Sequence, residues 1–375
     1  MRAEDALARA VLEQTLRVRR GESVAIEAWS HSLPWARALV VEARRRGARP
    51  TLIVEDESAF FRSLELLGGA TWSGPVDGKA EGADARIYLD GPEAFPRLLG
   101  LPAADLDAWQ TRRERPAARS PRSRPARTVR LAIADATATA AARYGVDPIG
   151  WQNELLRASL VDPRSLEAQG RRFTRAVAGA HRVRVRHSNG TDLSFELSAR
   201  PPILDVGRPR ATAPHRAARL PSGILLLAVR EGSAEGTWEA NRPSYDRFAV
   251  PPVAVGGRFE FRRGRLGEFA FDRGGGPFAA AYARAGRARE RPAAMSLGLN
   301  PSISGAPEAV ELGLGTAGLL LGDGPFPGPN RASGFSFLAT LAHADIELDG
   351  RPWLVHGLPA GRPPRSAGSY RGARR

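Results

Sequence analysis

The sequence predicts a protein of two parts, an α/β N-terminal domain with a largely parallel sheet and a β-rich α+β C-terminal domain. The chain has 375 residues, more than one ordinary hydrophobic core accommodates. In the first part, helical and strand-like apolar patterns alternate, which is typical of a parallel sheet covered by helices. From residue 181 onward, apolar and polar residues alternate one by one, as in antiparallel strands.

The N-terminal alternation begins with a helix over 4–18, where Leu7, Val11 and Leu12 recur at helical spacing. A short buried strand is expected at 24–28. The pattern then continues as helix 33–48, strand 51–57, helix 58–69, strand 85–91, helix 102–114, strand 128–135, helix 137–145 and a helical stretch at 148–180. Helices of this length between strands predict a largely parallel sheet that is covered on both faces.

The C-terminal part begins with a predicted hairpin, in which Val183 and Val185 precede an Asn189-Gly190 turn and a second alternating run. Further strands are expected at 224–229, 257–272 and 345–357, and one helix at 276–292. The domain boundaries that follow are 1–165 for the N-terminal domain, 166–357 for the C-terminal domain and 358–375 for a basic tail.

The positive charge of the chain is concentrated in two segments. The net charge is +15, but residues 111–130 contain eight Arg and one Glu, and residues 358–375 contain five Arg and no acid. The rest of the chain therefore carries only +3. Because Pro, Ser, Gly and like charges do not support a core, the two segments are interpreted as a solvated loop and a disordered tail. A nucleic acid partner is disfavoured by this uneven distribution.

Composition also limits the possible metal chemistry and location. The chain has no cysteine, so a metal site would need His, Asp and Glu side chains. No apolar run approaches the ~18 residues that cross a bilayer, and the N-terminus carries acids where a signal peptide is basic. We expect a cytoplasmic protein without a membrane partner. The six histidines are His31, His181, His187, His215, His343 and His356.

The order of several segments resembles the M29 family of metal-dependent aminopeptidases, the thermophilic aminopeptidase T and S group. The segments that carry the resemblance are 7–28, 36–57, 83–93, 190–197, LPSG at 220–223, LGLNP at 297–301 and ELDG at 347–350. The resemblance implies an α/β N-terminal domain followed by a β-rich catalytic domain, usually in a homodimer. It also implies two divalent metals that activate a water molecule for attack on the N-terminal peptide bond.

The metal-ligand positions that the resemblance implies do not carry ligands in this sequence. The two glutamates, the histidine after a Gly-Thr pair and the closing His-x-Asp fall at Ile224, Ala294, Gly318, Ser336 and Leu338. The family tyrosine falls near Pro325 or Phe326, which have no hydroxyl. A dinuclear site needs several carboxylates or imidazoles, and apolar side chains cannot replace them.

The leading hypothesis is therefore an M29-like protein that has lost its dinuclear metal site and acts as a non-catalytic or repurposed binder of a peptide or small molecule. It predicts no cofactor and no stoichiometric divalent metal. Besides the former ligand positions, Glu235, Arg242 and Tyr245 are candidate binding residues, because they follow the 224–229 strand in segments that resemble the family cavity.

Two alternatives stay open. In the first, the protein is an active hydrolase of the aminopeptidase type that binds zinc, cobalt or manganese through relocated ligands. His343 and Asp345, which would share one face of a strand, are the candidate metal ligands, together with Glu308 and Glu311. Some relatives of the fold that the resemblance implies are iron-dependent dioxygenases of dihydroxypyridines, so other chemistry on it has precedent, and that chemistry also needs metal ligands. In the second, the Arg-rich segments bind an anionic polymer.

Overall fold

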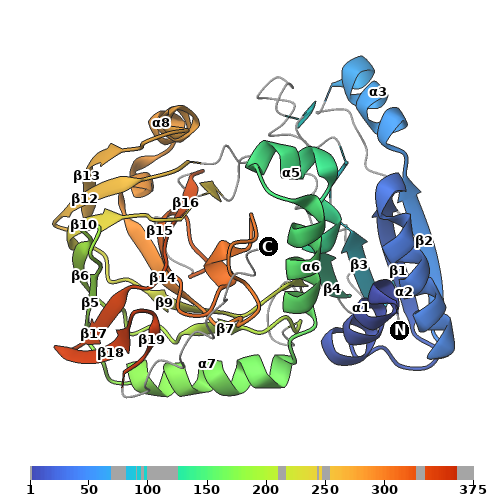
Figure 1. Cartoon of the computed structure of the whole chain (residues 1–375), viewed down its shortest axis with the longest axis horizontal. Helices are drawn as coiled ribbons and strands as arrows, with labels where there is room; N and C mark the ends of the chain where they lie inside the picture. The colour runs from blue at the N-terminus through green and yellow to red at the C-terminus, as the bar shows by residue number, and fades with distance from the viewer. Residues whose placement is uncertain are drawn as a thin grey trace, which may run out of the picture.

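The computed structural model describes residues 2–68, 82–89, 91–93, 97–98, 126–209, 217–242, 245–246, 254–326 and 334–360. Within these ranges the chain forms one parallel sheet of five strands and two antiparallel sheets of eight and six strands (Figure 1). The predicted fold class, a parallel α/β part followed by a β-rich antiparallel part, is confirmed.

The parallel sheet contains the predicted strands of the first part of the chain. Its strands are β1 (Ser23–Trp29), β2 (Arg49–Glu55), β3 (Ala85–Leu89), β4 (Arg127–Leu131) and β8 (Ala217–Leu220), in the order β2-β1-β3-β4-β8. Its helices are α1 (Ala3–Ala10), α2 (Leu33–Arg45), α3 (Glu57–Leu67), α5 (Ala138–Tyr144) and α6 (Pro148–Ser159). The last strand, β8, comes from beyond the C-terminal hairpin, so the chain returns to this sheet after leaving it.

Several helices begin at the capping residues that the sequence offers. The Asp56 side chain accepts a hydrogen bond from the backbone N–H of Ala59 at the start of α3. Asp147 caps α6 in the same way, and Pro148 follows it at the first helical position. Both features satisfy or remove backbone donors that a helix start leaves unpaired, which fixes where these helices begin.

The C-terminal part consists of two antiparallel sheets. The eight-stranded sheet has the order β13-β12-β10-β6-β5-β17-β18-β19, and the six-stranded sheet has the order β11-β16-β15-β14-β9-β7. The first contains β5 (Arg182–Arg186), β6 (Asp192–Glu196), β10 (Glu235–Glu239), β12 (Arg258–Arg262), β13 (Arg265–Ala270), β17 (Asp345–Leu348), β18 (Arg351–Val355) and β19 (Leu358–Pro359). The second contains β7 (Ile203–Asp205), β9 (Ile224–Ala228), β11 (Tyr245–Asp246), β14 (Pro292–Gly298), β15 (Ala317–Gly322) and β16 (Ser336–Leu341). Two helices, α7 (Pro163–Val177) and α8 (Gly275–Arg284), complete this part.

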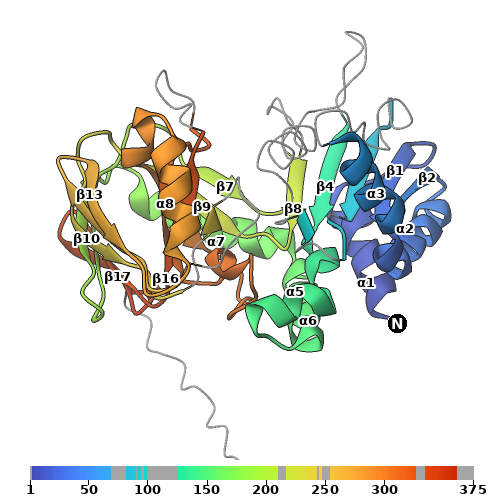
Figure 2. The same ribbon diagram turned by 90° about the horizontal axis from the view of Figure 1, so that it is seen from above.

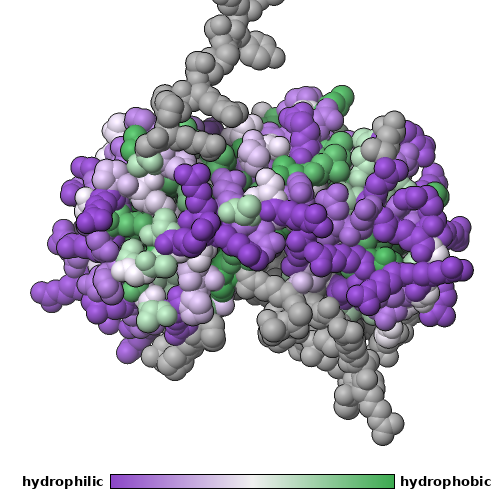
Figure 3. Space-filling view, turned by 90° about the horizontal axis from the view of Figure 1, so that it is seen from below, coloured by the Kyte–Doolittle hydropathy of each residue, from purple (hydrophilic) through white to green (hydrophobic). Residues whose placement is uncertain are grey.

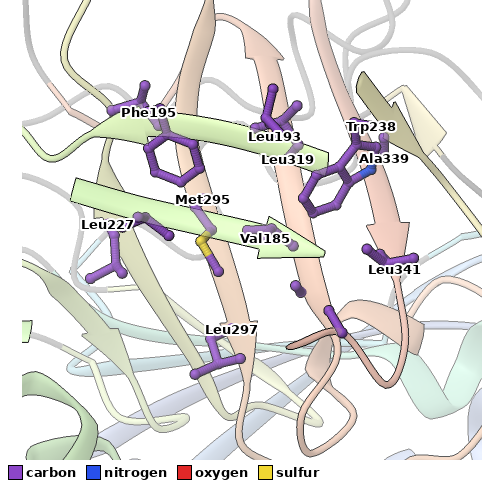
Figure 4. Close-up of a cluster of buried hydrophobic side chains, with 14 of the residues drawn as sticks. Val185, Leu193, Phe195, Leu227, Trp238, Met295, Leu297, Leu319, Ala339 and Leu341 are labelled. Carbon is purple, nitrogen blue, oxygen red and sulfur yellow. The ribbon is translucent and has the colours of Figure 1, made fainter. Parts of the chain in front are cut away.

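The main hydrophobic core lies between the two antiparallel sheets. Figure 4 shows Val185, Leu193 and Trp238 of the eight-stranded sheet facing side chains of the six-stranded sheet such as Met295 and Leu319. All of these side chains are fully buried. Helix α7 adds Leu166, Phe173 and Val177 to the same core, which is why the predicted helical stretch at 148–180 divides into two helices.

Of the six-stranded sheet, only β9 was predicted from the sequence, and the missed strands include the three long ones β14, β15 and β16. Every residue in these three strands is buried, so they lack the alternation of apolar and polar residues that marked the hairpin. The predicted hairpin itself is confirmed, with Arg182 opposite Glu196 and Arg186 opposite Asp192.

The basic segments are shorter than the sequence indicated. Residues 111–125 and 361–375 lie outside the described residues, as do the predicted helix 102–114 and His215. The predicted loop 111–130 overlapped the strand predicted at 128–135, and the strand is the one that forms, as β4 over Arg127–Leu131. The Arg127 guanidinium donates to the carbonyl of Arg17 at 3.0 Å and pairs with Glu22. Residues Leu358–Pro359 form β19, because their backbone pairs with β18 rather than with water.

The surface of the described residues is largely polar. In the view of Figure 3, hydrophilic residues cover most of the visible face and hydrophobic residues form small scattered groups. Large exposed apolar side chains include Leu52 and Val54 on the edge strand β2 and Leu66 and Leu67 at the end of α3. The homodimer stays a prediction. No helix among the described residues is both long enough and apolar enough to cross a membrane.

Helices α5 and α6 join the two parts, which lie side by side in Figures 1 and 2. Trp151 and Leu155 of α6 share a hydrophobic cluster with Ile303 and Ala306 of the C-terminal part. Next to this cluster, the Glu154 carboxylate accepts hydrogen bonds from the consecutive backbone N–H groups of Ser304, Gly305 and Ala306 at 2.5, 2.9 and 3.1 Å. Partial burial would raise the pKa of Glu154, but these donors outweigh it, so its pKa is lowered.

We predict that Glu154→Gln lowers the free energy of unfolding by about 1–2 kcal/mol, because the amide offers these donors a neutral acceptor. The expected loss is no larger than this because water reaches the partly exposed Glu154 carboxylate and weakens its interactions. Since the folded pKa is depressed, the contribution is present above about pH 4.3 and disappears as pH falls through the lowered pKa. Denaturant unfolding of both proteins between pH 7 and pH 3 measures the difference. The exposed Glu268→Gln is the matched control, and an equal effect of both variants would contradict the prediction.

Candidate functional site

The positions that the resemblance aligns with metal ligands lie on one face of the six-stranded sheet. Paired residues of neighbouring strands project to the same side of a sheet, as do residues two apart in one strand. Between β9 and β14, the register places Ile224 opposite Gly298 and Ala294 opposite Ala228. Between β14 and β15, Ala294 lies opposite Leu320 and Gly318 opposite Ser296. Between β15 and β16, Gly318 lies opposite Thr340, Leu338 opposite Leu320 and Ser336 opposite Gly322. We call this surface, which carries Ile224, Ala294, Gly318, Ser336 and Leu338, the Ile224 face.

The Ile224 face is apolar and closely packed. Its side chains form a hydrophobic cluster separate from the main core, composed of Leu226, Ala228, Ala293, Ala294, Leu320, Phe326 and Leu338, with Ile203 and Ile224 packed against it. Ala294 is 0% exposed and Leu338 is 4% exposed. Phe326, near the position of the family tyrosine, contributes its ring to this cluster. The positions thus come together, but as a packed apolar surface.

Gly318 shows how little space this face leaves. A Cβ atom at Gly318 would lie 2.3 Å from the Ser296 hydroxyl and 2.9 Å from Cδ1 of Leu338. Both distances are shorter than atoms in contact allow, so an imidazole cannot replace the glycine unless its neighbours move. The polar groups on this face include the buried hydroxyls of Ser296, Ser336 and Thr340. At its β7 edge lies the Asp205 carboxylate, which pairs in register with Ile224 and accepts a hydrogen bond from the Ser222 hydroxyl at 3.2 Å. The Ser296 hydroxyl has no hydrogen-bond partner among the described residues.

The other candidate binding residues are divided between two locations. Arg242 lies beside the edge of the Ile224 face, because its backbone N–H donates to the carbonyl of Thr340 at 3.3 Å. The backbone of Tyr245, in β11, pairs with that of Leu338 in β16. The side chain of Tyr245 is not among the parts of the chain that the structure describes. Glu235 belongs to the eight-stranded sheet, where its exposed carboxylate accepts a hydrogen bond from the backbone N–H of Arg263 at 2.5 Å.

The strand geometry expected for His343 and Asp345 is wrong. His343 is exposed, precedes β17 and has a φ of 60°, a left-handed turn conformation, so the alternation of a strand does not align it with Asp345. Asp345 instead accepts a hydrogen bond from the backbone N–H of His356 at 2.7 Å. Its carboxylate also lies 3.9 Å from the His356 ring. The side chains of His343 and Asp345 therefore do not share a strand face, which was the reason to expect that they bind one metal.

The acids proposed beside them also have structural contacts. Glu308 has a φ of 59° and accepts a hydrogen bond from the hydroxyl of Tyr144 in α5. Its carboxylate lies 4.0 Å from Arg219 of β8, whose guanidinium is also 3.8 Å from Asp135. Glu311 belongs to the short 3-10 helix Val310–Leu312. These contacts place Glu308 where the two parts of the molecule meet, beside the hydrophobic cluster against which both Tyr144 and Ile224 pack.

A group of potential metal ligands does occur elsewhere among the described residues. One ring nitrogen of His31 and one carboxylate oxygen each of Glu57 and Glu93 lie within 4.8 Å of one another. The sequence analysis missed this group, although its residues lie at or just after the ends of strands that it predicted, at 24–28, 51–57 and 85–91. The carboxyl ends of neighbouring parallel strands meet at one edge of the sheet, and this rule would have brought the three residues together.

Together, the parallel α/β sheet and the paired antiparallel sheets define an aminopeptidase-like fold. The chain is similar to wild-type AmpT from Thermus thermophilus, an M29 aminopeptidase, with a TM-score of 0.67, 19% identity and coverage of 96% of this chain and 99% of that chain. It is also similar to a 2,5-dihydroxypyridine dioxygenase from Pseudomonas putida KT2440, with a TM-score of 0.59, 15% identity and coverage of 96% and 97%. No family model and no curated protein matches the sequence. These likenesses establish the fold alone.

The packing on the Ile224 face predicts that two substitutions change the free energy of unfolding in opposite directions. Ser296→Ala should leave the free energy of unfolding unchanged or raise it by about 1 kcal/mol, because it removes a buried hydroxyl without a partner. Gly318→Ala should lower it by about 1–3 kcal/mol through overcrowding. The double variant should recover part of that loss, because the nearest clashing atom is the Ser296 hydroxyl. Urea unfolding of the four proteins measures this coupling, and strictly additive effects would contradict it.

Proposed function

We propose that this protein is an M29-like protein without the dinuclear metal site on its six-stranded sheet, and that it binds a peptide or small molecule without cleaving it. The observation that carries the proposal is the apolar packing of the Ile224 face, where Ile224, Ala294, Gly318 and Leu338 come together. The aminopeptidase-like fold supports the origin of these positions in a metal-binding arrangement.

Electrostatics supports this interpretation. Two divalent cations carry a charge of +4, which a dinuclear site offsets with several carboxylates and imidazoles. The described residues on the Ile224 face supply mainly alkyl groups and neutral hydroxyls, which neither offset that charge nor lower the pKa of a bound water. The carboxylate at its edge, Asp205, accepts hydrogen bonds from the Ser222 hydroxyl and the backbone N–H of Gly207, and a single carboxylate does not make a dinuclear site. Hydrolysis by metal-activated water has no support from these side chains.

For binding, we propose that Arg242 recognises an anionic group of the ligand. The backbone of Arg242 is hydrogen-bonded to β16 at the border of the Ile224 face, which carries apolar side chains. A guanidinium pairs with a carboxylate through two parallel hydrogen bonds, which favours a peptide or an organic acid. Glu235 lies in the other sheet and has no part in this proposal.

The alternative of an active hydrolase with relocated ligands has less support. It depended on His343 and Asp345 sharing a strand face, and His343 lies in a turn before the strand. The anionic-polymer alternative concerns residues 111–125 and 361–375, which lie outside the described residues, so it stays a prediction.

We predict no metal-dependent release of p-nitroaniline from leucine p-nitroanilide and related aminoacyl substrates in the presence of zinc, cobalt or manganese. AmpT from Thermus thermophilus, assayed in parallel, is the positive control for the fold. Turnover that a chelator abolishes, and that His343→Ala also abolishes, would overturn the proposal in favour of relocated ligands. Turnover that Arg242→Ala reduces without any metal dependence would point to a different hydrolytic mechanism.

A second prediction concerns restoring a family ligand. Ala294→Glu should lower the free energy of unfolding by about 3 kcal/mol or more, because it buries a carboxylate among alkyl groups. It should not confer zinc-dependent stabilisation. The matched control is Ala280→Glu on the exposed side of α8, where the change should stay within about 0.5 kcal/mol. Zinc-dependent stabilisation of the Ala294→Glu variant beyond that of the unchanged protein would indicate that the face still accommodates a metal.

A further inference from the structure

The parallel sheet has a strand order that predicts where a ligand binds. In the order β2-β1-β3-β4-β8, the chain moves outward from β1 to β2 and then crosses to β3 on the opposite side. Open α/β sheets bind ligands beyond the carboxyl ends of their strands, at the point where the order reverses, which here lies between β1 and β3. We call the carboxyl ends of β1, β2 and β3 the β1/β3 edge.

His31, Glu57 and Glu93 all lie at the β1/β3 edge. His31 is in the 3-10 turn Ser30–Ser32 directly after β1, Glu57 is the first residue of α3 after β2, and Glu93 follows β3. One potential ligand atom from each lies within 4.8 Å of the other two. Ligands at about 2.0–2.2 Å from one zinc ion lie at most roughly 4.4 Å apart, so the group is close to the spacing that a single ion imposes.

The His31 ring is oriented as in a metal ligand. Its Nε2 lies 3.1 Å from the backbone carbonyl oxygen of Ala134, which follows β4. Because a carbonyl oxygen only accepts hydrogen bonds, Nε2 carries the proton and Nδ1 keeps its lone pair. Nδ1 is buried and has no hydrogen-bond partner among the described residues. Metal-ligating histidines commonly donate the other ring N–H to a carbonyl or carboxylate, which fixes the tautomer and the ring.

The two glutamates are also held in place by their neighbours. The backbone N–H of Glu93 donates to Oε2 of Glu57 at 2.7 Å, which links the loop after β3 to the start of α3. The Thr137 hydroxyl, which caps α5, donates to the backbone carbonyl of Glu93 at 3.1 Å. Glu57 itself lies at a helix N-terminus, where the helix dipole favours a carboxylate. The three ligand loops are therefore fixed relative to one another.

We propose that the β1/β3 edge is a binding site for one divalent transition metal of the zinc type, held by Nδ1 of His31 and the carboxylates of Glu57 and Glu93. Imidazole nitrogen favours zinc and its neighbours over magnesium and calcium, which prefer oxygen ligands alone. Three protein ligands leave a coordination position for water or an anionic ligand. The site is independent of the Ile224 face, and it replaces the sequence-based expectation that the chain binds no stoichiometric metal.

The test uses the full-length protein without a histidine tag, stripped of metal and titrated with zinc, with bound metal counted per chain by mass spectrometry after dialysis. We expect one zinc per chain and a visible d–d absorption when cobalt replaces zinc. His31→Ala should weaken zinc binding more than about 100-fold, since it removes a ligand rather than a supporting group. Glu57→Gln keeps the size of the side chain and should also weaken zinc binding. It provides the test if His31→Ala proves poorly folded.

Two histidine variants outside the site are the matched controls. His356→Ala and His343→Ala should bind zinc like the unchanged protein, because both residues are exposed and lie in the C-terminal part. No bound zinc, zinc retained by both His31→Ala and Glu57→Gln, or binding of magnesium instead of zinc would each overturn the proposal. Zinc lost only in His343→Ala would overturn it too, and would also count against the proposed function. The two proposals can therefore fail separately.

Discussion

The burial of both faces of the six-stranded sheet is the constraint on which the C-terminal part depends. One face packs against the eight-stranded sheet and forms the main core, and the other is the Ile224 face. Strands β14, β15 and β16 are buried along their whole length as a result. Water is excluded from the positions where the fold could have held charged ligands, and a carboxylate placed there would lose hydration without gaining a partner.

The same fold offers two different surfaces for chemistry. The neighbours in structure are an aminopeptidase and a dioxygenase, so the fold does not specify one reaction, and function has to be inferred from side chains. On the Ile224 face these side chains are apolar. At the β1/β3 edge they are an imidazole and two carboxylates. Among the described residues, the group of three potential metal ligands therefore lies at the edge of the parallel sheet.

The link between the two parts combines backbone pairing, apolar packing and charge. Strand β8 returns the chain to the parallel sheet, and β9 of the six-stranded sheet begins a few residues later, at Ile224. Glu154 binds three backbone N–H groups of the C-terminal part, next to the cluster formed by Trp151 and Ile303. Arg219 of β8 lies near Glu308 across the same boundary. These contacts couple the position of the Ile224 face to the parallel sheet.

The sequence by itself determined the fold class, the parallel strands β1 to β4, the hairpin and the helix starts, because local periodicity and capping residues such as Asp56 and Asp147 encode them. Tertiary structure decided the rest. Fully buried strands have no periodic signal, and the turn at His343 depends on a backbone conformation that spacing does not reveal. His31 and Glu93 are far apart in the chain and meet only because parallel strands align their carboxyl ends, which no local pattern records.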